Sequence, residues 1–227
     1  DQTARNDLIC AHTAPDQIHN ECSGKHAGFL TLSKHLGGAA DYELIDHPVQ
    51  KAVKAAFEDV TGETSPMYGI DGCSAPNHAC TLHGLARAMA FYASAHTRSD
   101  TRSMAAARLT QAMATCPEFV AGEGRACTDL MRAMNNKVAI KAGAEGDFVA
   151  IIPEKRIGIA IKVLDGATRG RDCVIAALLV KLGVLDPNHP AAVAYLNPPI
   201  VNRRGLVTGF IKPDAALLSG PFNTKAA

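Results

Sequence analysis

The sequence predicts an α+β fold in which helices pack against an antiparallel sheet. Apolar residues recur at helical spacing in the first half of the chain, as at Leu82 and Leu85. Runs rich in β-branched residues follow at residues 147–152 and 157–164. A further apolar helical segment comes after them and can cover the sheet. The 227 residues, 47% of them hydrophobic, can bury a large core, and we expect a single domain over residues 1–227.

Five helices are predicted ahead of the sheet. The first is closed by Gly37, and the second has Asp46 as its expected N-cap and ends near Gly62. Pro117 stops the fourth helix, because proline cannot continue the hydrogen-bond ladder. The five segments span residues 25–36, 46–62, 81–95, 102–115 and 127–134.

The sheet is predicted from three segments. A polar turn at residues 153–156 separates the last two, which predicts an antiparallel hairpin. A helix follows, beginning at Thr168 or Asp172 and closed by Gly183. The three strands span residues 138–141, 147–152 and 157–164.

Charge and cysteine content narrow the class of function. The 23 basic and 22 acidic residues give a net charge of +1, which favours a small-molecule partner over nucleic acid or an anionic membrane. No apolar run approaches the roughly 20 residues that span a bilayer, so we expect a soluble chain. Seven cysteines without regular spacing fit reduced thiols, which predicts a cytoplasmic location.

Two cysteine turns carry the strongest chemical signal. Cys22 and Lys25 are three residues apart, which on a helical turn puts a thiol and an amine on one side. With Cys73 alongside, three protein ligands could hold a zinc ion and leave the fourth position for water or a ligand. Lysine is an unusual ligand, because it must first lose its proton. The open alternative is that Cys22 and Cys73 are ordinary buried thiols.

A self-contained Cys/His zinc site is the weaker alternative. Its spacing matches none of the Cys-x-x-Cys patterns that are typical of structural zinc. The simpler interpretation places the two histidines at the surface and on a helix, and the second cysteine in the core. The four candidate ligands are Cys73, His78, Cys80 and His83.

Two further candidates accompany predicted turns. Lys141 ends a strand and is followed by Ala-Gly, a pattern similar to the K-T-G strand element of serine β-lactamases. The glycine would let substrate atoms approach the strand. Arg125 ends the glycine-rich loop 121–125, where its guanidinium could bind a carboxylate through two hydrogen bonds. A solvated lysine and a simple turn are the plain alternatives.

Four motifs occur in an order that resembles the asparaginase II family, the rhizobial-type inducible L-asparaginases. The resemblance runs over essentially the whole chain, and four motifs in order are far more specific than any one. It implies a fold similar to the serine β-lactamase and glutaminase group, hydrolysis of L-asparagine to L-aspartate and ammonia, and a homodimer. The motifs are CSGKHAG at residues 22–28, DGCSAP at 71–76, AGEGRACT at 121–128 and KAGAEG at 141–146.

The resemblance also implies a role for each matched residue. A zinc ion would lie next to the catalytic centre, with one carboxylate close to the zinc ligands and a lysine on a strand of the catalytic cluster. The implied roles are zinc binding for Cys22, Lys25 and Cys73, catalysis for Asp71 and Lys141, and substrate binding for His26 and Arg125.

One feature of the family is missing from the sequence. Family members carry an S-x-x-K pair upstream of the first cysteine motif, where the lysine activates the serine for attack. No S-x-x-K occurs in these 227 residues. Because the chain starts with Asp1 rather than Met, we expect it to be the C-terminal part of a longer enzyme, with a naturally short relative as the alternative.

Two rival functions from other classes stay open. One is a non-catalytic module that binds zinc or an amino acid. The other is a thiol-based redox protein, which ranks last because the sequence contains no Cys-x-x-Cys.

Overall fold

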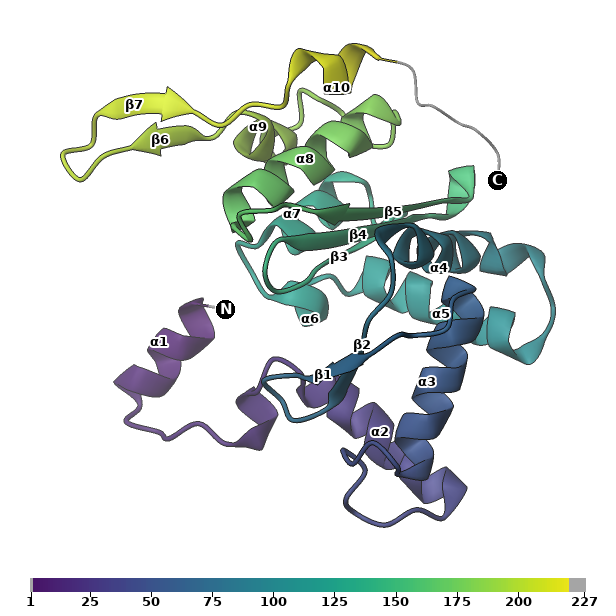
Figure 1. Ribbon diagram of the computed structural model, residues 1–227. Coiled ribbons are helices and arrows are strands. Elements are labelled where there is room, and N and C mark those ends of the chain that lie inside the picture. The colour runs from purple at the N-terminus through teal and green to yellow at the C-terminus, as the bar shows by residue number, and fades with distance from the viewer. Residues whose placement is uncertain (1, 221–227) are drawn as a thin grey trace. The chain divides into compact units, whose positions relative to one another are not determined.

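The computed structural model describes residues 2–220 (Figure 1). The chain forms two compact units, Asp1–Ala88 (unit 1) and Met89–Ala227 (unit 2), which are described separately. The division falls inside helix α4 (Leu82–Ser94). Both units combine helices with small antiparallel sheets, so the α+β prediction is confirmed. The likeness to β-lactamases stays a prediction.

Unit 1 consists of helices followed by a two-stranded antiparallel sheet. Strand β1 (Tyr68–Ile70) pairs with β2 (Pro76–His78), and Gly69 lies opposite Asn77. Helix α3 contacts both α2 and β2. The helical elements are α1 (Gln2–Cys10), the 3-10 turn η1 (Gln17–His19), α2 (Ser23–Leu36) and α3 (Pro48–Thr61).

Capping residues set the ends of α2 and α3. Gly37 and Gly62 end the two helices in the left-handed conformation that glycine adopts without strain, each with φ of +67°. At the start of α3 the N-cap is His47, whose Nδ1 accepts a hydrogen bond of 3.2 Å from Val49 N–H. The prediction of Asp46 was wrong, because the proline at the first helical position places the cap directly before it.

The larger sheet lies in unit 2 and has the antiparallel order β3-β4-β5. The predicted hairpin is confirmed, with the 3-10 turn η3 (Pro153–Lys155) and a left-handed Arg156 between its strands. Observed and predicted strand ends differ by no more than two residues. The strands are β3 (Ala139–Ala142), β4 (Asp147–Ile152) and β5 (Ile157–Lys162).

Helices of unit 2 cover both faces of this sheet (Figure 1). Ile140 and Phe148 are fully buried on one face, in a core shared with α7 and α8. Ala139 and Ile151 point to the other face and pack against residues of α4 and α5, because side chains alternate along a strand. The helices are α5 (Thr101–Thr115), α6 (Glu118–Ala121), α7 (Ala126–Ala133) and α8 (Thr168–Lys181), with the 3-10 turn η2 (Ala95–Thr97) before α5.

Several short elements were not predicted from the sequence. Strands β6 and β7 form a second hairpin with a bulge near Val201, and most of its residues are exposed. The strands among them have only three or four residues, which is too short to show a clear period. These elements include α6, α9 (Pro190–Leu196), β6 (Pro199–Val201), β7 (Val207–Phe210) and α10 (Ala215–Ser219), together with α1, β1 and β2 in unit 1.

Candidate functional site

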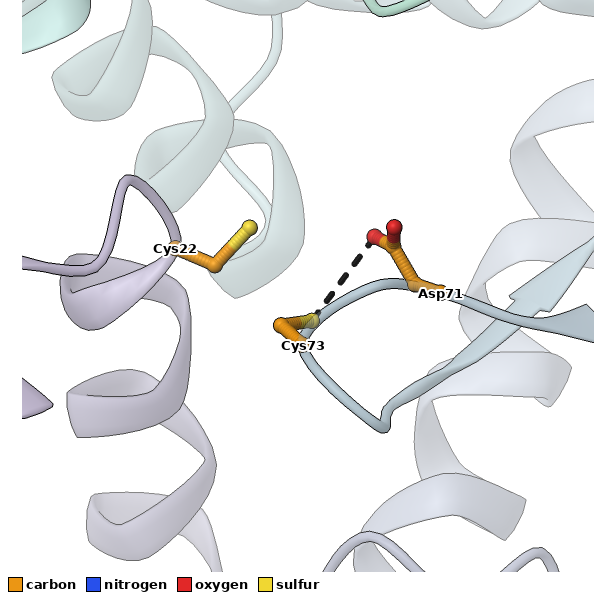
Figure 2. Close-up of side chains that lie close together, drawn as sticks. All are labelled: Cys22, Asp71 and Cys73. Atoms are coloured by element: carbon orange, nitrogen blue, oxygen red, sulfur yellow. Dashed lines mark hydrogen bonds between the residues drawn. The ribbon is translucent and has the colours of Figure 1, made fainter.

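Three metal-binding side chains meet in unit 1. Cys22 is the N-cap of α2, and Asp71 and Cys73 lie in the turn between β1 and β2. Their ligand atoms all lie within 4.8 Å of one another. Figure 2 shows the Cys22 and Cys73 thiols beside the Asp71 carboxylate. Within residues 2–220 it is the one group of three Cys, His, Asp or Glu side chains with such spacing.

The turn between β1 and β2 is held by its own backbone. Asp71 N–H donates to Ala75 C=O at 2.9 Å, and Ser74 N–H donates to Asp71 C=O at 2.8 Å. Ser74 adopts a φ of +72°, a left-handed conformation that is uncommon outside glycine. Asp71 Oδ1 accepts from Gly72 N–H at 2.7 Å, and Oδ2 lies 3.7 Å from Cys73 Sγ. The turn therefore presents a carboxylate and a thiol together.

Lys25 reaches the same cluster from the first turn of α2, where its Nζ donates to Asp71 Oδ2 at 3.2 Å. Burial disfavours the ammonium, but hydrogen bonds with Cys73 and Asp71 outweigh it and raise the pKa of Lys25. The hydrogen bond from Gly72 N–H, followed by that from Lys25, lowers the pKa of Asp71. Burial raises the pKa of the Cys22 thiol, and the nearby Lys25 charge opposes this shift. The ion pair between Lys25 and Asp71 therefore ties α2 to the turn between β1 and β2.

The donor set of this cluster fits a zinc ion. Thiolate sulfur and carboxylate oxygen are both common zinc ligands. The raised pKa values of Cys22 and Lys25 mean that the metal-free cluster retains protons, which the charge of a metal would displace on binding. The structure thus gathers Cys22, Lys25 and Cys73 with Asp71 as an additional donor.

His26 follows Lys25 in α2 but makes different contacts. Its Nδ1 lies 2.8 Å from Tyr42 Oη, and its ring packs edge-on against Tyr42 and Phe29. Its Nε2 is buried and has no hydrogen-bond partner in the described part of the chain. The role of His26 in substrate binding stays a prediction.

The alternative Cys/His site is not assembled. Within residues 2–220 no group of three metal-binding side chains includes His78, Cys80 or His83. The His78 ring packs against Phe57 and Tyr68 instead. His78 is therefore a half-buried residue that makes aromatic contacts.

A second candidate cluster surrounds the end of β3 in unit 2. Lys141 is exposed, and its Nζ donates to the C=O of Ala142. Ala142 N–H donates to Cys127 Sγ at 3.2 Å, and the C=O of Gly143 accepts a hydrogen bond from Arg171. Helices α7 and α8 therefore hold the backbone that directly follows Lys141.

Arg125 is the N-cap of α7 and ends the glycine-rich loop. Gly122 and Gly124 have φ values of +81° and +67°, and Thr128 Oγ1 donates to Gly122 C=O at 2.6 Å. Burial raises the pKa of Asp172, and the positive charge of Arg125 is among the groups that oppose this shift. Arg125 is thus within electrostatic reach of the start of α8.

Sequence reasoning missed three residues of this second cluster. Cys127 stands within a motif, but Arg171 and Asp172 belong to none. Arg171 is only 5% exposed, and its Nε donates to Asp172 Oδ1 at 3.1 Å. A charged pair directly before an apolar helical run was the available signal.

Comparison with known families gives one match. A family model described as L-asparaginase II matches residues 1–213. No curated protein matches the chain. Among the described residues, no helix has the length and apolar character needed to cross a membrane.

Proposed function

Since the chain belongs to the L-asparaginase II family, we propose that its intact gene product hydrolyses the side-chain amide of L-asparagine to L-aspartate and ammonia. The family match over residues 1–213 carries this proposal. The gathering of Cys22, Lys25, Asp71 and Cys73, which belong to two of the four motifs, supports it. The proposal extends to a cytoplasmic location, which the cysteine content predicts, and to a homodimer, which the motif resemblance implies.

The proposed reaction is acyl transfer. A serine attacks the amide carbonyl, a lysine shuttles the proton to the leaving ammonia, and water then releases aspartate. We propose Lys141 as the strand lysine of the catalytic cluster and Asp71 as the catalytic carboxylate. Asp71 is suited to hold a nearby proton donor in place, because its lowered pKa keeps it ionised and it accepts a hydrogen bond from Lys25. The serine would come from a segment outside these 227 residues.

Zinc is the proposed cofactor. Cys22 and Cys73 would hold it through sulfur, and Lys25 would bind it through Nζ after losing its proton. A bound zinc ion supplies positive charge that can polarise and orient a substrate oxygen. Asp71 lies against the same atoms and would keep Lys25 oriented.

Recognition of the substrate is proposed for Arg125 and His26. Arg125 can bind a carboxylate with two parallel hydrogen bonds, and L-asparagine carries one carboxylate that does not react. His26 has an Nε2 without a partner among the described residues. Its Nδ1 is already fixed by Tyr42.

A non-catalytic zinc or amino-acid binding module is the second candidate. The observation that favours it is the lack of S-x-x-K in the 227 residues. The asparaginase and the binding module would use the same ligand residues, so only the hydrolysis of L-asparagine distinguishes them.

Ammonia release from L-asparagine by the intact gene product, measured beside the 227-residue chain, tests the proposal. We expect turnover by the intact product and almost none by the short chain, because loss of a nucleophile costs on the order of a millionfold in rate. An intact product that binds zinc but releases no ammonia would support the binding module. Turnover by the short chain would place the nucleophile within it, and Ser23 and Ser74 would be the first alanine substitutions.

A further inference from the structure

Arg171 is a buried cation at the end of the sheet in unit 2. It lies in the first turn of α8 and is 5% exposed. Its guanidinium makes three contacts: Nη1 donates to the C=O of Gly143, Nε donates to Asp172 Oδ1 at 3.1 Å, and Cζ lies 5.9 Å from the centre of the Phe148 ring. These contacts link α8 to the segment that follows β3.

The burial of Arg171 calls for an explanation beyond packing. Removing a guanidinium from water is energetically costly, and one partly buried carboxylate offsets only part of that cost. An apolar side chain could fill the same space next to Phe148 at a lower cost. The group that requires a strong donor here is the carbonyl of Gly143, two residues after Lys141.

Hydrogen bonds fix the backbone of Ala142 and Gly143, the two residues that follow Lys141. Ala142 N–H donates to Cys127 Sγ, and Gly143 N–H donates to Asp147 C=O at 2.9 Å. A Cβ at Gly143 would lie 3.0 Å from Asp147 Cβ, so the turn is also closely packed. Arg171 supplies the remaining bond, to the C=O of Gly143.

We propose that Arg171 is a positioning residue for Lys141. This inference rests on the proposed function, in which Lys141 serves the catalytic cluster. A lysine amine stands on a flexible four-carbon stem, so its placement depends on a fixed Cα and a fixed strand direction. Arg171 holds the peptide that sets this direction, and it acts through Lys141 rather than on the substrate.

Steady-state kinetics of the intact gene product test the inference with Arg171→Met and Arg171→Lys. Arg169→Met is the matched control on the same helix, because Arg169 is exposed and its ion pair, among the described residues, is with Asp165 just before the helix. We expect Arg171→Met to lower kcat about 10- to 100-fold at nearly constant KM, since small misplacements of catalytic groups cost this much. Arg171→Lys keeps the charge but loses the two-pronged geometry, so we expect a smaller fall in kcat.

Addition of guanidinium at concentrations too low to unfold the protein gives a readout that a merely structural role would not move. We expect it to restore part of the kcat of Arg171→Ala, whose shortened side chain leaves room for the added ion, and to leave the kcat of Arg169→Met unchanged, with sodium chloride as the salt control. If Arg171→Met does not fold, Arg171→Lys decides the question.

Folded Arg171 variants with the kcat of the wild type would overturn the inference, whatever their thermal stability. A wild-type product that releases no ammonia would overturn the proposed function instead, so the two failures are distinguishable.

Discussion

The two candidate clusters differ in what holds them. In unit 1 the cysteine cluster depends on a helix cap, a tight turn and one ion pair, and Lys25 and Asp71 remain more than a third exposed. In unit 2 the backbone after Lys141 is tied to α7 and α8, whose apolar faces belong to the main core. Only three of the buried hydrophobic side chains found within residues 2–220 lie in unit 1, namely Val49, Ala75 and Ala88.

This difference indicates how each cluster keeps its geometry. A site placed on a large core is ordered when the core forms, because its supports are apolar contacts. A site on a unit with few buried apolar side chains needs another source of order. A metal that bonds both α2 and the β1–β2 turn would supply it, because binding free energy then becomes folding free energy. We therefore expect zinc to stabilise unit 1 and to leave the stability of unit 2 unchanged.

The largest effect is expected from Lys141→Met. If Lys141 moves a proton in the reaction, kcat should fall by roughly 10²- to 10⁴-fold, the usual contribution of a general acid or base. The protein should keep its thermal stability, because the Lys141 side chain is exposed. Ammonia release by the intact gene product measures the change. Lys155→Met, at an exposed lysine of the β4–β5 turn, is the matched control and should leave kcat unchanged.

Cys73→Ser should abolish zinc binding by the intact gene product. A thiolate is a stronger zinc ligand than a serine hydroxyl, and the substitution leaves the site with one sulfur, that of Cys22. Zinc content by mass spectrometry of the metal should drop from about one ion per chain to near zero. Cys116→Ser removes an exposed thiol elsewhere and should retain the zinc. Full zinc content in the Cys73 variant would show that the metal lies elsewhere.

A pair of substitutions sharpens the roles of Lys25 and Asp71, whose side chains are hydrogen-bonded to each other. If Lys25 is a ligand and Asp71 is catalytic, Lys25→Met should lower zinc affinity about 10- to 100-fold or more, the range measured even for groups that only support a ligand. Asp71→Asn should keep zinc and lower kcat. The reverse pattern would make Asp71 the third ligand, which its oxygen within 4.8 Å of both thiols also allows.

Core truncation in unit 2 should be costly and independent of zinc. Leu130 of α7 is fully buried, so Leu130→Ala should reduce the free energy of unfolding by about 2–5 kcal/mol. Urea titrations with and without zinc measure this loss, which should be the same in both. Leu164→Ala is the control, since Leu164 is fully exposed and its truncation should change stability by about 0.5 kcal/mol or less.

The smallest effect concerns Tyr195, whose Oη donates to Asp129 Oδ2 at 2.7 Å. Burial, followed by that hydrogen bond, raises the pKa of Tyr195 above its ordinary value near 10. A raised folded-state pKa stabilises the protein below about pH 10, and this contribution is lost as the pH rises through the folded-state value. Tyr195→Phe should cost about 1–2 kcal/mol at neutral pH.

The same variant should also show a weaker loss of stability above about pH 10 than the wild type. Thermal unfolding followed by circular dichroism across this pH range provides the measurement. Parallel alkaline curves for the two proteins would contradict the assigned role of the hydroxyl.

The sequence predicted those parts of the molecule whose conformation is set by residues close together in the chain. The helices around Gly37 and Gly62 and the hairpin at residues 153–156 follow from glycine, periodicity and turn chemistry. The motifs also pointed to Cys22 and Cys73, which the fold brings together from α2 and the β1–β2 turn.

Features that depend on distant contacts were missed. Arg171 was missed because its hydrogen bond is to Gly143, which is 28 residues away in sequence, so no local pattern could reveal it. The cap at His47 was missed because aspartate is the more common N-cap residue, whereas the proline that follows His47 decides where the helix begins. Short hairpins such as β6–β7 carry too few residues for a period to appear.

Hydrogen exchange of the intact gene product, measured by mass spectrometry with zinc saturating and with zinc chelated, tests the central comparison most directly. We expect zinc to increase the protection of peptides covering residues 21–29 and 69–75, while peptides covering residues 139–150 exchange at the same rate in both states. Equal exchange of the first two segments with and without zinc would contradict it, as would a zinc effect confined to residues 139–150.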